Sequence, residues 1–85
     1  MKGFDSHIGF ATFFGKKHEK DCLFLESLKD LGCIPFVRSN CPTASISNDG
    51  YNEITGTVQN PMRQDRAPGG SSSGEAALIY LRCSP

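Results

Sequence analysis

The sequence has no excess of charge of either sign, because nine Lys and Arg residues balance nine Asp and Glu residues in a chain of 85. A balanced chain lacks the basic footprint that nucleic acids or anionic membranes attract. No run approaches the roughly 20 apolar residues that span a bilayer. The first residues, 1–5, lack the apolar centre of a signal peptide. We therefore expect no nucleic-acid partner and no membrane span in this stretch.

A Cys-x-x-Cys pair is also absent. The four cysteines are irregularly spaced, at Cys22, Cys33, Cys41 and Cys83, which disfavours a zinc site. A disulfide framework needs an oxidising compartment, and nothing in the sequence indicates one. We expect reduced, mostly structural thiols, no metal and no cofactor.

The length allows at most one small domain, and a chain of this size buries only about 60–65% of its unfolded surface. Residues 18–31 have an amphipathic helical pattern, with apolar side chains at Phe24, Leu25, Leu28 and Leu31. Gly32 is placed to end that helix. The apolar run 33–37 then predicts a short buried strand, although Pro35 cannot donate to a ladder. A helix, a glycine and a strand in this order form half of an α/β unit.

The most informative stretch is the glycine and serine run of residues 67–77. Ser72 and Glu75 have the spacing of a capping box, which predicts a helix beginning at Ser72 or Ser73. Gly69 and Gly70 carry no Cβ, so the backbone there can adopt a positive φ or approach another group closely. The helix N-terminus would then present unpaired N–H groups, which favour negative charge.

Three interpretations of this run can be compared from its residues. A flexible linker fits the composition, but a linker does not lead directly into an apolar helix. A phosphate-binding loop would require a lysine inside or just after the glycines, and none is present. A non-catalytic segment that binds an anion at the helix N-terminus remains an alternative.

Residues 68–78 resemble the amidase signature motif, Gly-Gly-Ser-Ser-Gly-Gly-[Ser/Glu]-x-Ala, with Ser73 where that family has its third glycine. The resemblance implies an α/β fold, a mixed sheet covered by helices, and amide hydrolysis by a Ser-Ser-Lys triad. It makes Ser71 the serine that follows a cis peptide bond and relays protons, with Ser72 as its supporting neighbour. By the same resemblance, residues 1–85 are a partial amidase domain, incomplete at both ends.

The other two triad positions fall outside the motif. Lys2 matches the second lysine of the family's Lys-x-x-x-x-x-Lys-Gly pattern, which places the catalytic lysine a few residues before Met1. The nucleophilic serine is expected roughly two dozen residues beyond Ser71, with its oxyanion-forming run. His7 and His18 have no nearby carboxylate arrangement that would favour acid–base work. We expect the 85-residue chain to be inactive alone.

Residues 33–42 are similar to a segment of animal fatty acid amide hydrolases, a likeness carried by Pro35-Phe36 and Pro42. The polar loop of residues 43–67 then matches the wall of the acyl-binding channel, with Ser45, Ile46 and Ser47 as substrate-binding residues. A loop of this length is typically functional. The implied substrate is a fatty acid amide, or another small amide if the chain is a different amidase, such as an amidotransferase subunit. The resemblance also allows a homodimer, and membrane contact through parts outside these residues.

Overall fold

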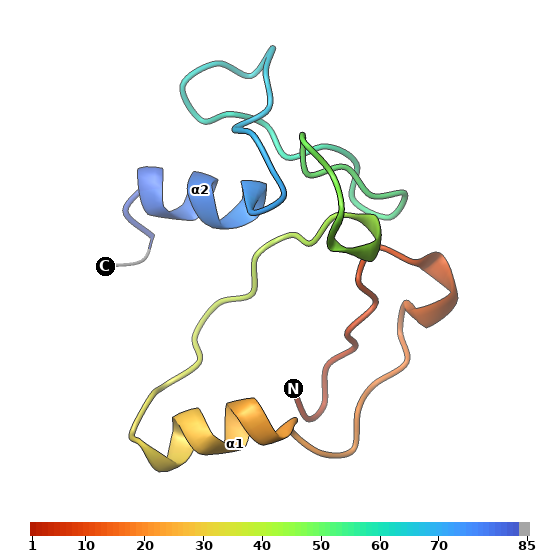
Figure 1. Ribbon diagram of the computed structural model, residues 1–85, viewed down its shortest axis with the longest axis vertical. Coiled ribbons are helices and arrows are strands. Elements are labelled where there is room, and N and C mark those ends of the chain that lie inside the picture. Colours follow the sequence, from red (N-terminus) through yellow and green to blue (C-terminus); the bar gives the residue numbers. More distant parts are fainter. Residues whose placement is uncertain (84–85) are drawn as a thin grey trace.

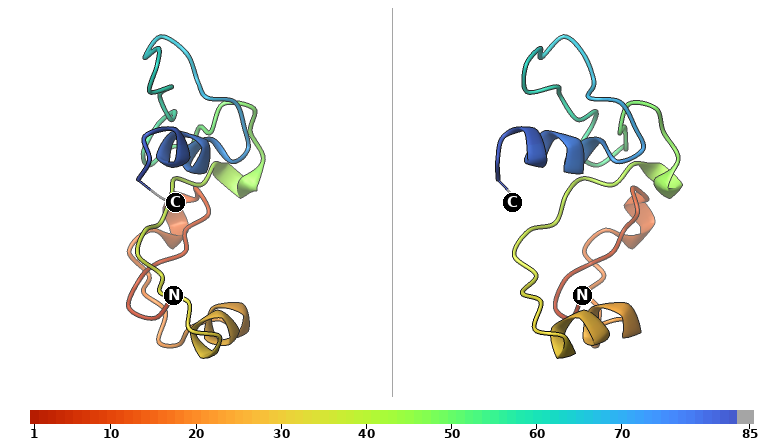
Figure 2. Two further views of the ribbon diagram at one scale, coloured as in Figure 1. Left: turned by 90° about the vertical axis from the view of Figure 1, so that its left-hand side faces the viewer. Right: turned by 60° about the vertical axis from the view of Figure 1, so that its left-hand side comes forward.

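The computed structural model describes residues 1–83 and contains two short α-helices within long irregular segments (Figure 1). The elements in chain order are η1 (Ala11–Phe13), α1 (Leu23–Asp30), η2 (Thr43–Ser45) and α2 (Ser73–Tyr80). The two α-helices stand well apart in every view, and residues 31–42 run between them (Figures 1 and 2). The end of this connection lies beside the first turn of α2.

Helix α1 is shorter than predicted, because it begins at Leu23 and not near His18. The backbone of His18 is engaged elsewhere: its N–H donates to the Phe4 carbonyl and its carbonyl accepts from the Gly3 N–H. These bonds hold residues 17 and 18 in isolated bridges to the N-terminal segment. The predicted C-terminal end is confirmed, since Gly32 follows the helix with a φ of 87° and donates to the Lys29 carbonyl.

The predicted strand at residues 33–37 is wrong, and no regular strand occurs among residues 1–83. The segment lies extended without ladder hydrogen bonds, and Pro35 has no N–H to offer. A strand needs a neighbouring strand to pair with, and four isolated bridges elsewhere are the only pairings in residues 1–83. The two predicted helices are therefore present, but the sheet of an α/β unit is not.

No large hydrophobic side chain is buried among residues 1–83. The radius of gyration of the Cα atoms is 13.9 Å, whereas a compact domain of this length has about 12 Å. The exposed apolar groups include Phe24 on α1, Phe36 in the connection and Leu81 after α2. The fold is thus an open frame, held mainly by hydrogen bonds. None of its helices in residues 1–83 is long and apolar enough to cross a membrane.

Helix α2 begins at Ser73, as predicted, but the predicted capping box does not form. Ser72 occupies the N-cap position with φ −86° and ψ 40°, outside the extended conformation that N-cap residues adopt, and its side chain makes no cap hydrogen bond. The Ser73 hydroxyl instead donates to the Gly69 carbonyl oxygen. This bond closes the glycine and serine run onto the first turn of α2.

Candidate active site

Ser71 and Ser72 line one small cavity of about 200 Å³ beside the start of α2. A distant part of the sequence, residues 39–42, lines the same cavity, and Ser45 and Glu75 complete the lining. The peptide bond between Gly70 and Ser71 is cis, as the resemblance implies. Both serines are solvent-exposed, so their hydroxyls are accessible to a molecule in the cavity.

The three residues predicted for the acyl channel have different surroundings. Ser45 lines the cavity together with Ser71, and its Oγ lies 3.4 Å from the Cys41 Sγ. Ile46 is 81% exposed and stands outside the cavity. The Ser47 hydroxyl belongs to a turn, where its Oγ accepts from the N–H groups of residues 49, 50 and 51. Of the three, only Ser45 is brought to the serine motif.

The Ser47 turn also holds the Asp49 carboxylate. The Ser47 hydroxyl donates to Asp49 Oδ1, which also accepts from the Tyr51 N–H at 3.1 Å. These hydrogen bonds, the one from Ser47 first, lower the pKa of Asp49. The carboxylate therefore stabilises the turn in its ionised form.

The first turn of α2 packs closely against two other segments of the chain. Ser73 is 1% exposed, and a Cβ placed on Gly50 would lie 2.5 Å from the Ser73 Cβ. On the other side, a Cβ placed on Gly74 would lie 2.6 Å from the Asn40 backbone nitrogen. Real Cβ atoms do not approach so closely, so glycine is required at both positions. The motif serines are therefore positioned against residues 40 and 50.

Sequence reasoning missed the most buried side chain in the described part of the chain, Asn52, which is fully buried. Its Nδ2 donates to Asn40 Oδ1 and to the Cys41 carbonyl, both at 2.8 Å. Its Oδ1 accepts from the N–H groups of Ile54 and Thr55, at 2.9 and 2.8 Å. The spacing Asn-x-Ile-Thr could have signalled this turn, because Asn side chains bond the backbone two residues onward.

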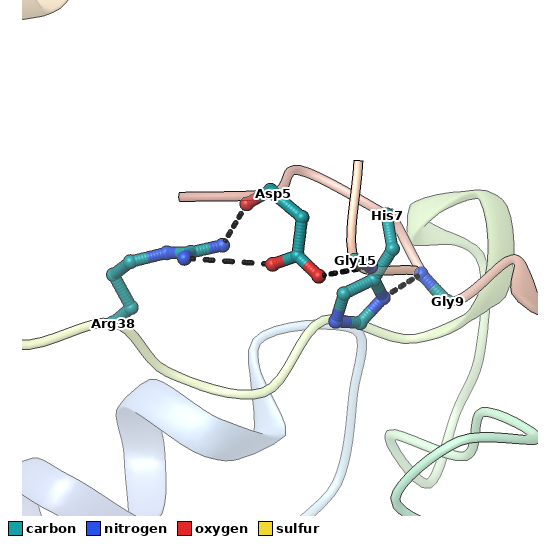
Figure 3. A network of polar contacts seen from close by, with 5 residues as sticks. All are labelled: Asp5, His7, Gly9, Gly15 and Arg38. Atoms are coloured by element: carbon teal, nitrogen blue, oxygen red, sulfur yellow. Dashed lines mark hydrogen bonds and ion pairs between the residues drawn. The ribbon is translucent and has the colours of Figure 1, made fainter. Parts of the chain in front are cut away.

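A second, larger cavity of about 460 Å³ shares residues 39–41 with the first and is bordered by Asp5, His7 and Arg38. Arg38 donates to the Asp5 backbone oxygen at 2.5 Å (Figure 3). Its guanidinium also lies over the Phe4 ring, 5.3 Å from the ring centroid. The Asp5 carboxylate accepts from the Gly15 N–H at 2.8 Å. That hydrogen bond first, and the charges of His7 and Arg38 second, lower the pKa of Asp5.

Neither His7 nor His18 lines the cavity that contains Ser71 and Ser72. His7 Nδ1 accepts from the Gly9 N–H at 3.0 Å (Figure 3), and the His18 backbone serves the bridge to the N-terminal segment. No three His, Cys, Asp or Glu side chains within residues 1–83 are grouped as a metal site would require. The four cysteines are free.

Comparison with known proteins identifies the class to which this site belongs. The chain matches the Amidase family over residues 1–85, and it therefore belongs to that family. It is 44% identical over 78 residues to the vitamin D3 hydroxylase-associated protein of Gallus gallus, covering 92% of this chain and 17% of that protein. It is 42% identical over 84 residues to fatty-acid amide hydrolase 1 of Sus scrofa, covering 99% of this chain and 14% of that one.

A putative amidase of Curvularia clavata is 38% identical over 79 residues, covering 93% of this chain and 15% of that protein. The chain thus spans about one-sixth of the length of the relatives it matches. Two of these three relatives are named as a fatty-acid amide hydrolase and a putative amidase.

Proposed function

We propose that residues 1–85 form the serine-motif segment of an amidase that hydrolyses fatty acid amides to a fatty acid and an amine. The observation that carries the proposal is the cavity in which Ser71 and Ser72 face residues 39–42 and Ser45. Two likenesses support the substrate class: the identity to the Sus scrofa fatty-acid amide hydrolase and the Pro35-Phe36 and Pro42 pattern.

In the proposed mechanism, Ser71 relays a proton. A nucleophilic serine attacks the carbonyl carbon of the amide, and its hydroxyl proton passes through the Ser71 hydroxyl to a neutral lysine. The proton then returns along the same route to the departing amine as the C–N bond breaks, which leaves the acyl group as an ester on the nucleophilic serine. Water then attacks this ester, and the relay returns the proton to the serine oxygen as the fatty acid leaves. Desolvation must lower the pKa of that lysine toward neutrality. In this proposal, neither the lysine nor the nucleophile is a residue of 1–85.

Within residues 1–85, the proposed roles follow the positions of the side chains. Ser71 is exposed at the cavity, where it can exchange protons with groups from other parts of an amidase. Ser72 lines the same cavity and supports the motif. Ser45 contributes the wall that the acyl group contacts, and Ile46 and Ser47 are proposed to extend that wall once the remaining amidase covers this face.

The test uses a chimera, here called the extended protein, in which residues 1–85 replace the matching segment of the Sus scrofa fatty-acid amide hydrolase. Its kcat/KM is measured for a long-chain fatty acid amide and for acetamide. We expect the long-chain amide to be preferred. Preference for acetamide would contradict the proposed substrate class while leaving amide hydrolysis intact.

A second candidate is an amidase for shorter or more polar acyl groups. Two observations favour it: the likeness to the putative amidase of Curvularia clavata and the polar turn at Asn48-Asp49-Gly50 in the proposed channel wall. Preference for acetamide in the same assay would support this candidate.

A further inference from the structure

We propose that Asn52 is a positioning residue for the serine motif, acting through Asn40 and Cys41. The proposal rests on the proposed function only in its activity measurement, because the contacts themselves are independent of the reaction. Asn52 is fully buried in a chain that buries almost nothing else. A buried amide side chain needs partners for its donors and acceptor, and Asn52 has partners for all of them.

The two halves of the Asn52 side chain face different segments. Its oxygen accepts from Ile54 and Thr55, so it closes the turn within its own loop. Its nitrogen donates to Asn40 Oδ1 and to the Cys41 carbonyl, twelve and eleven residues earlier, respectively. Of the two polar atoms of the Asn52 side chain, only Nδ2 therefore hydrogen-bonds to residues that line the serine cavity.

Asn40 passes this constraint to α2 by two routes. Its backbone lies against Gly74, where a Cβ would stand 2.6 Å from the Asn40 nitrogen. Its side-chain nitrogen donates to the Gly50 carbonyl at 2.9 Å, and Gly50 packs on Ser73. Ser73 and Gly74 directly follow the two motif serines in the chain. Asn52 thus holds residues 40 and 50 against the first turn of α2, and this contact positions Ser71 and Ser72.

The chain offers a selective substitution, Asn52→Asp. A carboxylate has almost the same shape as an amide and still accepts from Ile54 and Thr55, but it cannot donate. The Cys41 carbonyl would then lose its donor from Asn52, Asn40 Oδ1 would keep only the Thr55 hydroxyl, and both oxygens would face a negative charge. Asn60→Asp is the matched control, since Asn60 Oδ1 accepts from the Met62 N–H at 2.9 Å in a later turn of the same loop and undergoes the same change of charge.

Both variants are made in the extended protein, and kcat and KM are measured for the amide that it hydrolyses. We expect Asn52→Asp to lower kcat at least about tenfold, because small misplacements of reacting groups carry penalties of that order and above. KM should stay within about threefold, because the substrate does not touch the buried Asn52. Asn60→Asp should leave kcat unchanged.

Hydrogen exchange at the α2 amides from Ala76 to Leu81 provides a readout that needs no turnover. It is measured on the extended protein, and we expect faster exchange in Asn52→Asp but not in Asn60→Asp. If the extended protein hydrolyses no amide, the proposed function fails and exchange alone decides the role of Asn52. If Asn52→Asp does not fold, Thr55→Val replaces it, because it removes the hydroxyl that donates to Asn40 Oδ1 at 2.6 Å.

Three results would overturn the role of Asn52. The first is unchanged exchange at α2 in the Asn52 variant. The second is equal loss of kcat in the Asn52 and Asn60 variants, which would reflect charge alone. The third is an effect confined to KM, which would make Asn52 part of substrate binding.

Discussion

Gly74 lies directly against the backbone of Asn40, so closely that a Cβ atom at position 74 would stand 2.6 Å from the Asn40 nitrogen and 3.0 Å from its carbonyl oxygen. The two residues are far apart in the sequence, and their contact joins the glycine and serine run to the end of the extended connection (Figure 1). The catalytic geometry proposed for Ser71 therefore depends on a contact between two backbones.

Gly74→Ala tests this contact. In an unconstrained helix the change would stabilise by about 1 kcal/mol, because alanine has the higher helix propensity. Here the new methyl group meets backbone that cannot rotate away, and overpacking of this kind destabilises by roughly 1–3 kcal/mol. We expect the Tm of the extended protein to fall. A raised Tm would show that the two segments are not in contact.

The 85-residue chain should not unfold cooperatively by itself. No large hydrophobic side chain is buried in residues 1–83, and cooperative unfolding requires a shared apolar core. The exposed apolar groups should instead promote association. Calorimetry and sedimentation of the isolated chain measure both properties. A sharp, concentration-independent transition of a monomer would contradict the open frame described above.

The N-terminal segment should loosen in acid. The Gly15 hydrogen bond lowers the pKa of Asp5 below its ordinary value of 3.8. A carboxyl group with a lowered pKa in the folded state contributes stability above its unfolded pKa and loses it as the pH falls through the folded pKa. The Gly15 amide shift, followed by NMR, should therefore titrate with a midpoint below 3.8. Asp5→Asn should abolish this titration, and a midpoint at or above 3.8 would refute the contact.

Ser45→Ala should act mainly on KM and on acyl preference. Ser45 lines the same cavity as Ser71, and a residue in the proposed acyl wall would contact the acyl chain equally in the ground and transition states. The change is made in the extended protein, with steady-state kinetics on amides of different chain length. A fall in kcat at constant KM would instead give Ser45 a role in the transition state.

Local signals in the sequence predicted local structure well. The start of α2 at Ser73 and the end of α1 before Gly32 both follow from residues within one turn of the boundary. The predicted start of α1 was wrong because the His18 backbone hydrogen-bonds to Gly3 and Phe4. These are long-range contacts, and the apolar periodicity of residues 18–31 carries no information about them. The strand at residues 33–37 failed for the same kind of reason, since pairing depends on a neighbour.

At the candidate site, too, local features were predicted and long-range contacts were not. The motif predicted the cis peptide bond before Ser71. Composition could not distinguish Asn52 from the other polar residues of its loop, because burial depends on where residues 40 and 41 fold back. Neither could it reveal that the Ser47 hydroxyl is engaged by its own turn.

The most direct test of the account is the effect of Ser71→Ala on kcat in the extended protein, with the unsubstituted 85-residue chain as a second sample. Proton relay operates only as the transition state forms, and general acid–base terms contribute about 10²–10⁴-fold in rate. We predict a fall in kcat of that size with little change in KM, and no turnover by the 85-residue chain. A kcat within about threefold of the unsubstituted protein, well short of the general acid–base range, would contradict the role of Ser71.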